Sequence, residues 1–171
     1  MELKRLTDPE QVGGFDCGDG DLNGFLIEDA LLSAQKHLAN TFVLIDGEKT
    51  VAYFCLLTDK ITKVDIQKAA WRKFRGAFPR GKHYSSYPSI KIGRFAVDAN
   101  YTKSGIGTSL MGIIKLILLN NVTLPAFRFL TVDAYLSAIP FYERNGFKLL
   151  EQLDENRDTR LMYFDMLSLS E

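Results

Sequence analysis

Apolar residues recur about every four positions between residues 21 and 38, which predicts an amphipathic helix with one face toward a core. The carboxylate of Asp19 or Asp21 is expected to cap its first turn, because a short oxygen acceptor binds the free amides there. Residues 106–119 also favour a helix, but apolar residues cover nearly every side of it. We therefore expect this second helix to be buried on more than one side.

Runs rich in β-forming residues alternate with these helices. We expect strands at residues 3–6, 41–45, 50–57, 89–98, 127–132, 149–153 and 161–167, and further helices at 64–78 and 138–145. The pair Asp46-Gly47 predicts a hairpin, because glycine accepts the positive φ of a tight turn. The order strand, helix, strand from residue 89 to 132 predicts a parallel βαβ unit with a right-handed crossover. The chain is therefore expected to form a mixed α/β sheet.

Composition narrows the class of protein. A chain of 171 residues with 46% hydrophobic residues predicts a single globular domain over residues 1–171. Its 21 basic residues balance 21 acidic ones, which excludes a globally basic nucleic-acid coat but leaves room for a local basic patch. Two cysteines, no secretory leader and no apolar run long enough for a membrane predict a reduced, cytoplasmic setting and no membrane partner.

The turn at residues 101–108 joins a predicted strand to a predicted helix and contains Gly105 and Gly107. Free amides at the start of a helix and the helix dipole form an anion site, most naturally for phosphate. The alternative is a connecting turn with two conformational glycines. The spacing fits neither a P-loop nor a dinucleotide-binding fingerprint.

Three segments of the sequence carry a family resemblance. They are Ile92-Gly93-Arg94-Phe95-Ala96-Val97-Asp98, the turn at residues 101–108, and Phe141-Tyr142-Glu143-Arg144-Asn145-Gly146-Phe147. Together they resemble the GNAT family of N-acetyltransferases. The resemblance implies a mixed, mostly antiparallel central sheet with a parallel βαβ acyl-CoA-binding unit and flanking helices. It also implies an enzyme that transfers an acetyl group from acetyl-CoA to a primary amine by direct attack, without a metal.

The resemblance also assigns residues. The backbone of Phe95, Ala96 and Val97 is expected to pair with the pantetheine arm of acetyl-CoA. The pyrophosphate is expected at Thr102, Lys103, Ser104, Gly105, Ile106, Gly107 and Thr108. Thr102 departs from the Gln or Arg of the family pattern. Lys103 either supplies a cation to the phosphates or is a solvated loop lysine.

Tyr142 is expected to be catalytic, since the tyrosine of this family segment donates a proton to the departing CoA thiolate. The alternative is a core aromatic whose hydroxyl is capped. Tyr135 stands where many family members have an asparagine, which changes the hydrogen bonding expected at the cofactor. No side chain is assigned as the general base.

The acceptor amine is left open. Residues 59–82 combine eight Lys and Arg residues with Trp71, Phe74 and Phe78, which suits either RNA binding or a solvated helix face above buried aromatics. A second pattern consists of Phe15-Asp16-Cys17-Gly18, Leu22 and Phe25-Leu26, with residues 93–98. This pattern is similar to that of GNAT toxins. Such toxins acetylate aminoacyl-tRNA and are neutralised by a small antitoxin protein. Zero net charge favours a small-molecule or peptide amine. A non-catalytic acyl-CoA-binding module and a homodimer also remain open.

Overall fold

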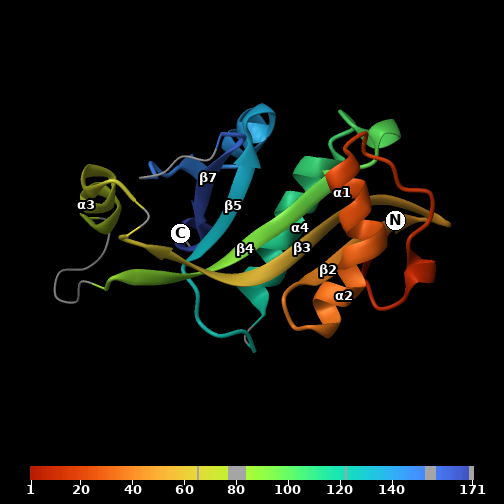
Figure 1. The fold of residues 1–171 in the computed structure, drawn as a ribbon, viewed down its shortest axis with the longest axis horizontal. Coiled ribbons are helices and arrows are strands. Elements are labelled where there is room, and N and C mark those ends of the chain that lie inside the picture. Colours follow the sequence, from red (N-terminus) through yellow and green to blue (C-terminus); the bar gives the residue numbers. More distant parts are fainter. Residues whose placement is uncertain (65, 77–83, 122, 153–156, 170–171) are drawn as a thin grey trace. The chain divides into compact units, whose positions relative to one another are not determined.

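The computed structural model describes residues 1–64, 66–76, 84–121, 123–152 and 157–169. The chain divides into two compact units: the first is Met1–Leu57 with Ile92–Asn121, and the second is Thr58–Lys91 with Val122–Glu171. Figure 1 labels the strands β3 (Lys49–Thr62) and β4 (Ser86–Val97). Both strands contribute residues to both units.

The first unit combines a sheet in the order β1-β2-β3-β4 with a helical segment. Strand β1 (Glu2–Arg5) is antiparallel to β2 (Asn40–Asp46), and β2 is antiparallel to β3. The turn between β2 and β3 places Gly47 at φ 62°, which confirms the predicted hairpin. Thr50 is fully buried in the first residues of β3.

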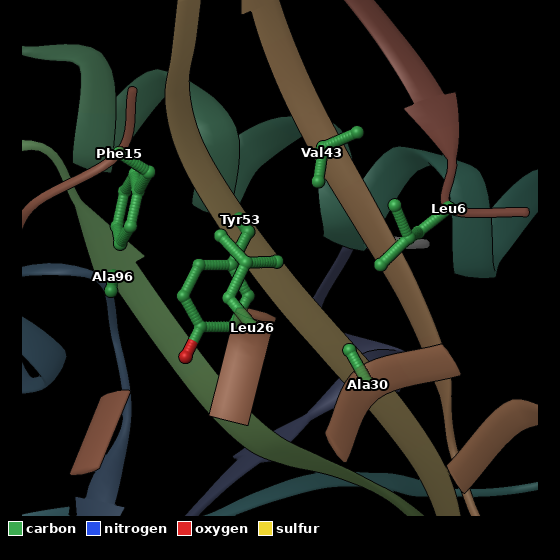
Figure 2. Packing of buried hydrophobic residues seen from close by; sticks show 7 residues of the cluster. All are labelled: Leu6, Phe15, Leu26, Ala30, Val43, Tyr53 and Ala96. Carbon is green, nitrogen blue, oxygen red and sulfur yellow. The ribbon is translucent and has the colours of Figure 1, made fainter. Parts of the chain in front are cut away.

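The predicted amphipathic helix is confirmed, with an interruption that the pattern does not indicate. Helix α1 (Gly20–Gly24) continues through a π-helical segment at Phe25–Asp29 into α2 (Ala30–Gln35). Asp19 is the cap, since its carboxylate accepts from the Leu22 amide at 3.0 Å. The buried face belongs to a cluster made of Leu6, Phe15, Leu26, Ala30, Val43, Tyr53 and Ala96. Figure 2 shows Leu26 and Tyr53 close together in this cluster.

Helix α4 (Ile106–Asn120) begins where the sequence predicts, but the expectation of burial on more than one side is wrong. One face is buried through Leu110, Met111, Ile114 and Leu118. The opposite side exposes Ile113, Leu116, Ile117 and Leu119, with 57% of Leu116 accessible. An apolar pattern without a clear period gives the length of a helix, but it does not say which sides have a partner.

The second unit contains the strands in the order β3-β4-β5-β7-β6, formed by β5 (Phe129–Tyr135), β6 (Lys148–Leu149) and β7 (Thr159–Asp165). Strand β5 is parallel to β4, and the Arg128 amide before it donates to the Pro88 carbonyl at 3.0 Å. The pairs β5–β7 and β6–β7 are antiparallel. The predicted mixed, mostly antiparallel sheet with flanking helices is therefore confirmed.

Two helices complete the second unit. Helix α3 (Lys68–Gly76) begins later than predicted, because Ile66 forms an isolated β-bridge with Gln152. Helix α5 (Ile139–Arg144) carries the predicted Phe-Tyr-Glu segment. The core of this unit consists of Ile61, Ile66, Trp71, Phe74, Tyr87, Phe129 and Leu150. None of the helices in the described ranges is both long enough and apolar enough to cross a membrane.

Candidate functional site

The glycine turn of the first unit has the backbone of an anion site. Gly105 is the N-cap of α4 and lies in the left-handed region, at φ 85° and ψ −7°. The first helical bond runs from the Ser109 amide to the Gly105 carbonyl at 3.0 Å, so the amides of residues 106–108 have no acceptor within the helix. A Cβ built on Gly105 meets no atom within 4 Å, so it would project into open space. A side chain there would occupy space that an incoming anion needs.

The hydroxyls of this turn serve the turn itself. Thr102 Oγ1 donates to the Ala99 carbonyl at 2.9 Å, and Ser104 Oγ donates to the Tyr101 carbonyl. No side chain caps the first turn of α4. Anion binding here would therefore depend on backbone amides and on the helix dipole. Lys103 is exposed and has a positive φ of 61°, which places a cationic side chain on the turn.

A buried carboxylate fixes the strand end from which this turn departs. Asp98 is fully buried and accepts four hydrogen bonds: from the Asp16 amide, from Lys49 Nζ, and from the amide and the side chain of Asn100. Burial alone opposes ionisation, but these hydrogen bonds outweigh it and lower the pKa of Asp98 to about 2. Asp98 is therefore ionised at neutral pH and holds the N-terminal loop and β3 to the end of β4.

Asp98 stands in the sequence only as the end of the Ile92–Asp98 segment, and neither Lys49 nor Asp16 is predicted as its partner. The three residues are far apart in the sequence, and nothing in the local pattern marks them as partners. The only available signal was a carboxylate placed directly after an apolar strand.

The predicted pantetheine-binding segment lies at the end of β4. Ala96 is buried in the core of the first unit, whereas Phe95 and Val97 are half-buried. The Asp98 amide donates to the Val51 carbonyl at 2.8 Å, which ties this end of β4 to β3. The structure thus places residues 95–97 on a fixed strand that leads directly into the glycine turn.

Tyr142 lies on α5 in the second unit and is 5% exposed. The rings of Phe141 and Phe147 pack edge-on against its ring at 5.2 and 5.4 Å. Burial raises the pKa of Tyr142, so the phenol keeps its proton at neutral pH. Among the described residues, nothing hydrogen-bonds to its hydroxyl. The expected alternative, a core tyrosine with a capped hydroxyl, is therefore not what the described residues show.

Two aromatic residues of the basic segment, Trp71 and Phe74, are not available for stacking on bases. Trp71 and Phe74 are each 7% exposed and pack with Tyr87 in the core of the second unit. Lys68, Arg72 and Lys73 are exposed on α3. Within the described part, exposed cations and buried rings match the second of the two expectations, a solvated helix face above buried aromatics. Phe78, Arg80 and Lys82 lie outside the described residues.

The mixed sheet has a glycine-capped helix after β4, and together with the family match this defines the class: an acetyl-CoA-dependent N-acetyltransferase. The model of the acetyltransferase (GNAT) domain matches residues 37–149, about two thirds of the sequence. The chain belongs to the GNAT acetyltransferase family.

Solved structures share this fold over nearly the whole chain. A tyrosine-to-phenylalanine mutant of KacT has a TM-score of 0.78 at 23% identity and covers 99% of this chain and 96% of its own. AtaT in complex with acetyl-methionyl-tRNAfMet has a TM-score of 0.75 at 20% identity, with 99% and 98% covered. A tyrosine-to-phenylalanine mutant of the AtaT toxin, bound to acetyl-CoA and the C-terminus of the antitoxin AtaR, has a TM-score of 0.72 at 20% identity, with 99% and 95% covered.

Proposed function

We propose that this N-acetyltransferase acts on the amino group of an aminoacyl-tRNA and is the toxin of a toxin–antitoxin pair. The observation that supports this acceptor is the structural similarity to AtaT in complex with acetyl-methionyl-tRNAfMet. The similarity extends over 99% of this chain. The exposed cations of α3, Lys68, Arg72 and Lys73, add a basic face suited to phosphates. The AtaT complex with the C-terminus of AtaR supports a small antitoxin as the protein partner.

The donor site that we propose is built from the first unit. The pyrophosphate of acetyl-CoA binds the amides of Ile106, Gly107 and Thr108, where Gly105 leaves the approach open. Lys103 adds a positive charge on the same turn. The backbone of residues 95–97 pairs with the amides of the pantetheine arm.

Tyr142 supplies the proton in the proposed reaction. The acceptor nitrogen attacks the thioester carbonyl, a carbon–nitrogen bond forms and the carbon–sulfur bond breaks. The Tyr142 hydroxyl donates its proton to the leaving thiolate, and the proton of the amine passes to water. Burial keeps this phenol protonated, and its hydroxyl has no competing acceptor among the described residues. Two of the similar structures are tyrosine-to-phenylalanine mutants, the change that removes only such a hydroxyl.

Mass spectrometry tests the acceptor. The purified protein is incubated with acetyl-CoA and, separately, with charged tRNA, uncharged tRNA, a polyamine, an aminoglycoside and a peptide. We expect one acetyl group on the amino acid of charged tRNA and none on uncharged tRNA. Acetylation of a small amine or peptide, with charged tRNA left unmodified, would replace the toxin assignment with a small-amine acetyltransferase.

A further inference from the structure

The second unit contains a hollow that the donor site does not use. Its volume is about 530 Å³, which is within the range of roughly 300–1,000 Å³ typical of small-molecule sites. Helix α3 lines it with Lys73 and Phe74, β5 with Phe129, the region of β6 with Lys148, and β7 with Tyr163. All of these residues belong to one compact unit, so the hollow is a feature of that unit alone.

Aromatic rings line this hollow. The ring of Phe74 lies 4.9 Å from the ring of Phe129 and 5.3 Å from that of Tyr163, and the latter two are 5.7 Å apart. Phe74 and Phe129 are buried, whereas Tyr163 is half-buried. Tyr163 is therefore the ring of this group that still has accessible surface. An accessible aromatic ring is a stacking partner for another planar ring.

Charged side chains surround these rings. Lys73 and Lys148 are exposed cations in the lining, and Glu151 is an exposed acid there. The carboxylate of Asp165, which also lines the hollow, accepts two hydrogen bonds from Arg128 at 2.6 and 2.8 Å. Because Arg128 already neutralises the charge of Asp165, the positive charges of the two lysines exceed the negative charge of Glu151. The hollow thus favours a ligand that combines an aromatic ring with negative charge.

We infer that the hollow is a nucleotide-binding subsite, with a base stacked on Tyr163 and its phosphate bound by Lys73 and Lys148. The inference builds on the proposed function, because the nucleotide would be one of the acceptor tRNA. A base stacked on one aromatic ring strengthens binding with little sequence preference, because every base has a planar face. Such a subsite would fix the tRNA relative to the second unit, whereas exposed lysines elsewhere on α3 give only diffuse attraction.

The fold supplies a reporter for this subsite. Trp71 is the only tryptophan of the chain, and its ring lies 5.7 Å from that of Phe74, which lines the hollow. Tryptophan fluorescence is measured while the trinucleotide CCA, which ends every tRNA, is added. Cytidine and ribose 5-phosphate are added separately as controls. We expect a saturable change with the trinucleotide and weaker binding of either control, since one lacks phosphate and the other lacks the base.

Matched variants locate the binding. Lys73→Glu with Lys148→Glu reverses two charges in the lining. Lys68→Glu with Arg72→Glu reverses two exposed charges on α3 that do not line the hollow. We expect the first pair to weaken trinucleotide binding by roughly tenfold or more, and the second to leave it within about twofold. Equal effects of the two pairs, or none from the first, would overturn the inference.

A change at Tyr163 tests stacking separately. Tyr163→Phe keeps the ring and should retain trinucleotide binding, whereas Tyr163→Leu removes it and should weaken binding. Circular dichroism shows whether each variant is folded. If Tyr163→Leu is unfolded, the lysine variants still decide the question.

Failure of this inference and failure of the proposed function give different results. Acetylation of charged tRNA by a wild-type protein that does not bind the trinucleotide would overturn the nucleotide subsite and leave the toxin assignment standing. In the other case, the wild type binds the trinucleotide, the Lys73→Glu, Lys148→Glu variant does not, and no tRNA is acetylated. That result would support the subsite and overturn the assigned acceptor.

Discussion

Lys49 Nζ lies 3.1 Å from Oδ1 of Asp98, so an ion pair joins the first residue of β3 to the residue that follows β4. The carboxylate is fully buried, whereas the lysine side chain is 34% exposed. The same carboxylate accepts from the Asp16 amide at 3.0 Å, and the Ala99 amide donates to the Asp16 carbonyl at 2.8 Å. These contacts fix the point at which the chain leaves β4 and enters the proposed pyrophosphate turn.

Asp98 should make the stability of the protein depend on pH at the acid end. Its pKa is about 2 in the folded protein, below its ordinary value of 3.8, so ionised Asp98 stabilises the folded state above pH 4. That contribution is lost as pH falls from about 4 to about 2. Chemical unfolding of the wild type and Asp98→Asn across this range checks it. The variant should lose roughly 2 kcal/mol at neutral pH and show a flatter acid limb. Parallel acid limbs would contradict this role.

The donor site can be tested at Gly105 with two substitutions that differ only in charge. Aspartate and asparagine have similar size and both tolerate positive φ better than most residues, so backbone strain should be nearly equal. Gly105→Asp adds a negative charge where the pyrophosphate is expected. It should weaken acetyl-CoA binding by at least roughly tenfold, or about 1.4 kcal/mol, and by more than Gly105→Asn does. Calorimetry on both folded variants measures this, and equal affinities would refute the pyrophosphate assignment.

Local patterns predicted the elements of this fold well. The strand from 89 to 98, the helix from 106 to 119 and the hairpin at Gly47 were all predicted by short-range signals: a run of β-forming residues, a long apolar-rich stretch and turn residues. The π-helical interruption at Phe25–Asp29 was missed, because the side-chain period barely changes over one extra residue. The exposed side of α4 was missed for a related reason. Burial depends on which element lies opposite, and no local pattern carries that information.

The candidate site was predictable in part. The glycine turn and Tyr142 could be named as candidates because each lies in a compact motif, and their roles stay predictions. Asp98 and its partners were not, since the contacts join residues 49 and 82 positions apart in the sequence. The hollow beside α3 was beyond sequence reasoning, because its lining comes from four separate elements. Composition alone could not tell whether Trp71 and Phe74 are buried in the core or exposed for stacking on RNA bases.

Tyr142→Phe should lower kcat by roughly 10²- to 10⁴-fold and change the KM for acetyl-CoA little. The ring would still pack against Phe141 and Phe147, so only the proton donor is lost. Because burial raises the pKa of Tyr142, the wild type should show no loss of activity from ionisation of this phenol as pH rises from about 7 to about 9. Tyr84→Phe, at an exposed tyrosine, is the control. Equal kcat for wild type and Tyr142→Phe, with chemistry rate-limiting, would return Tyr142 to a packing role.

The basic face of α3 should respond to salt if it binds tRNA. Each phosphate contact releases counterions, so the logarithm of the affinity falls linearly with the logarithm of the salt concentration. Reversing Lys68 and Arg72 to Glu removes two exposed cations and should reduce the magnitude of that slope by roughly 1.4 to 1.8. Acetyl-CoA affinity should stay unchanged, because the proposed donor site uses other residues. Titrations of intact charged tRNA at several salt concentrations give the slope. If the wild type binds no tRNA even at low salt, the acceptor must be a smaller amine.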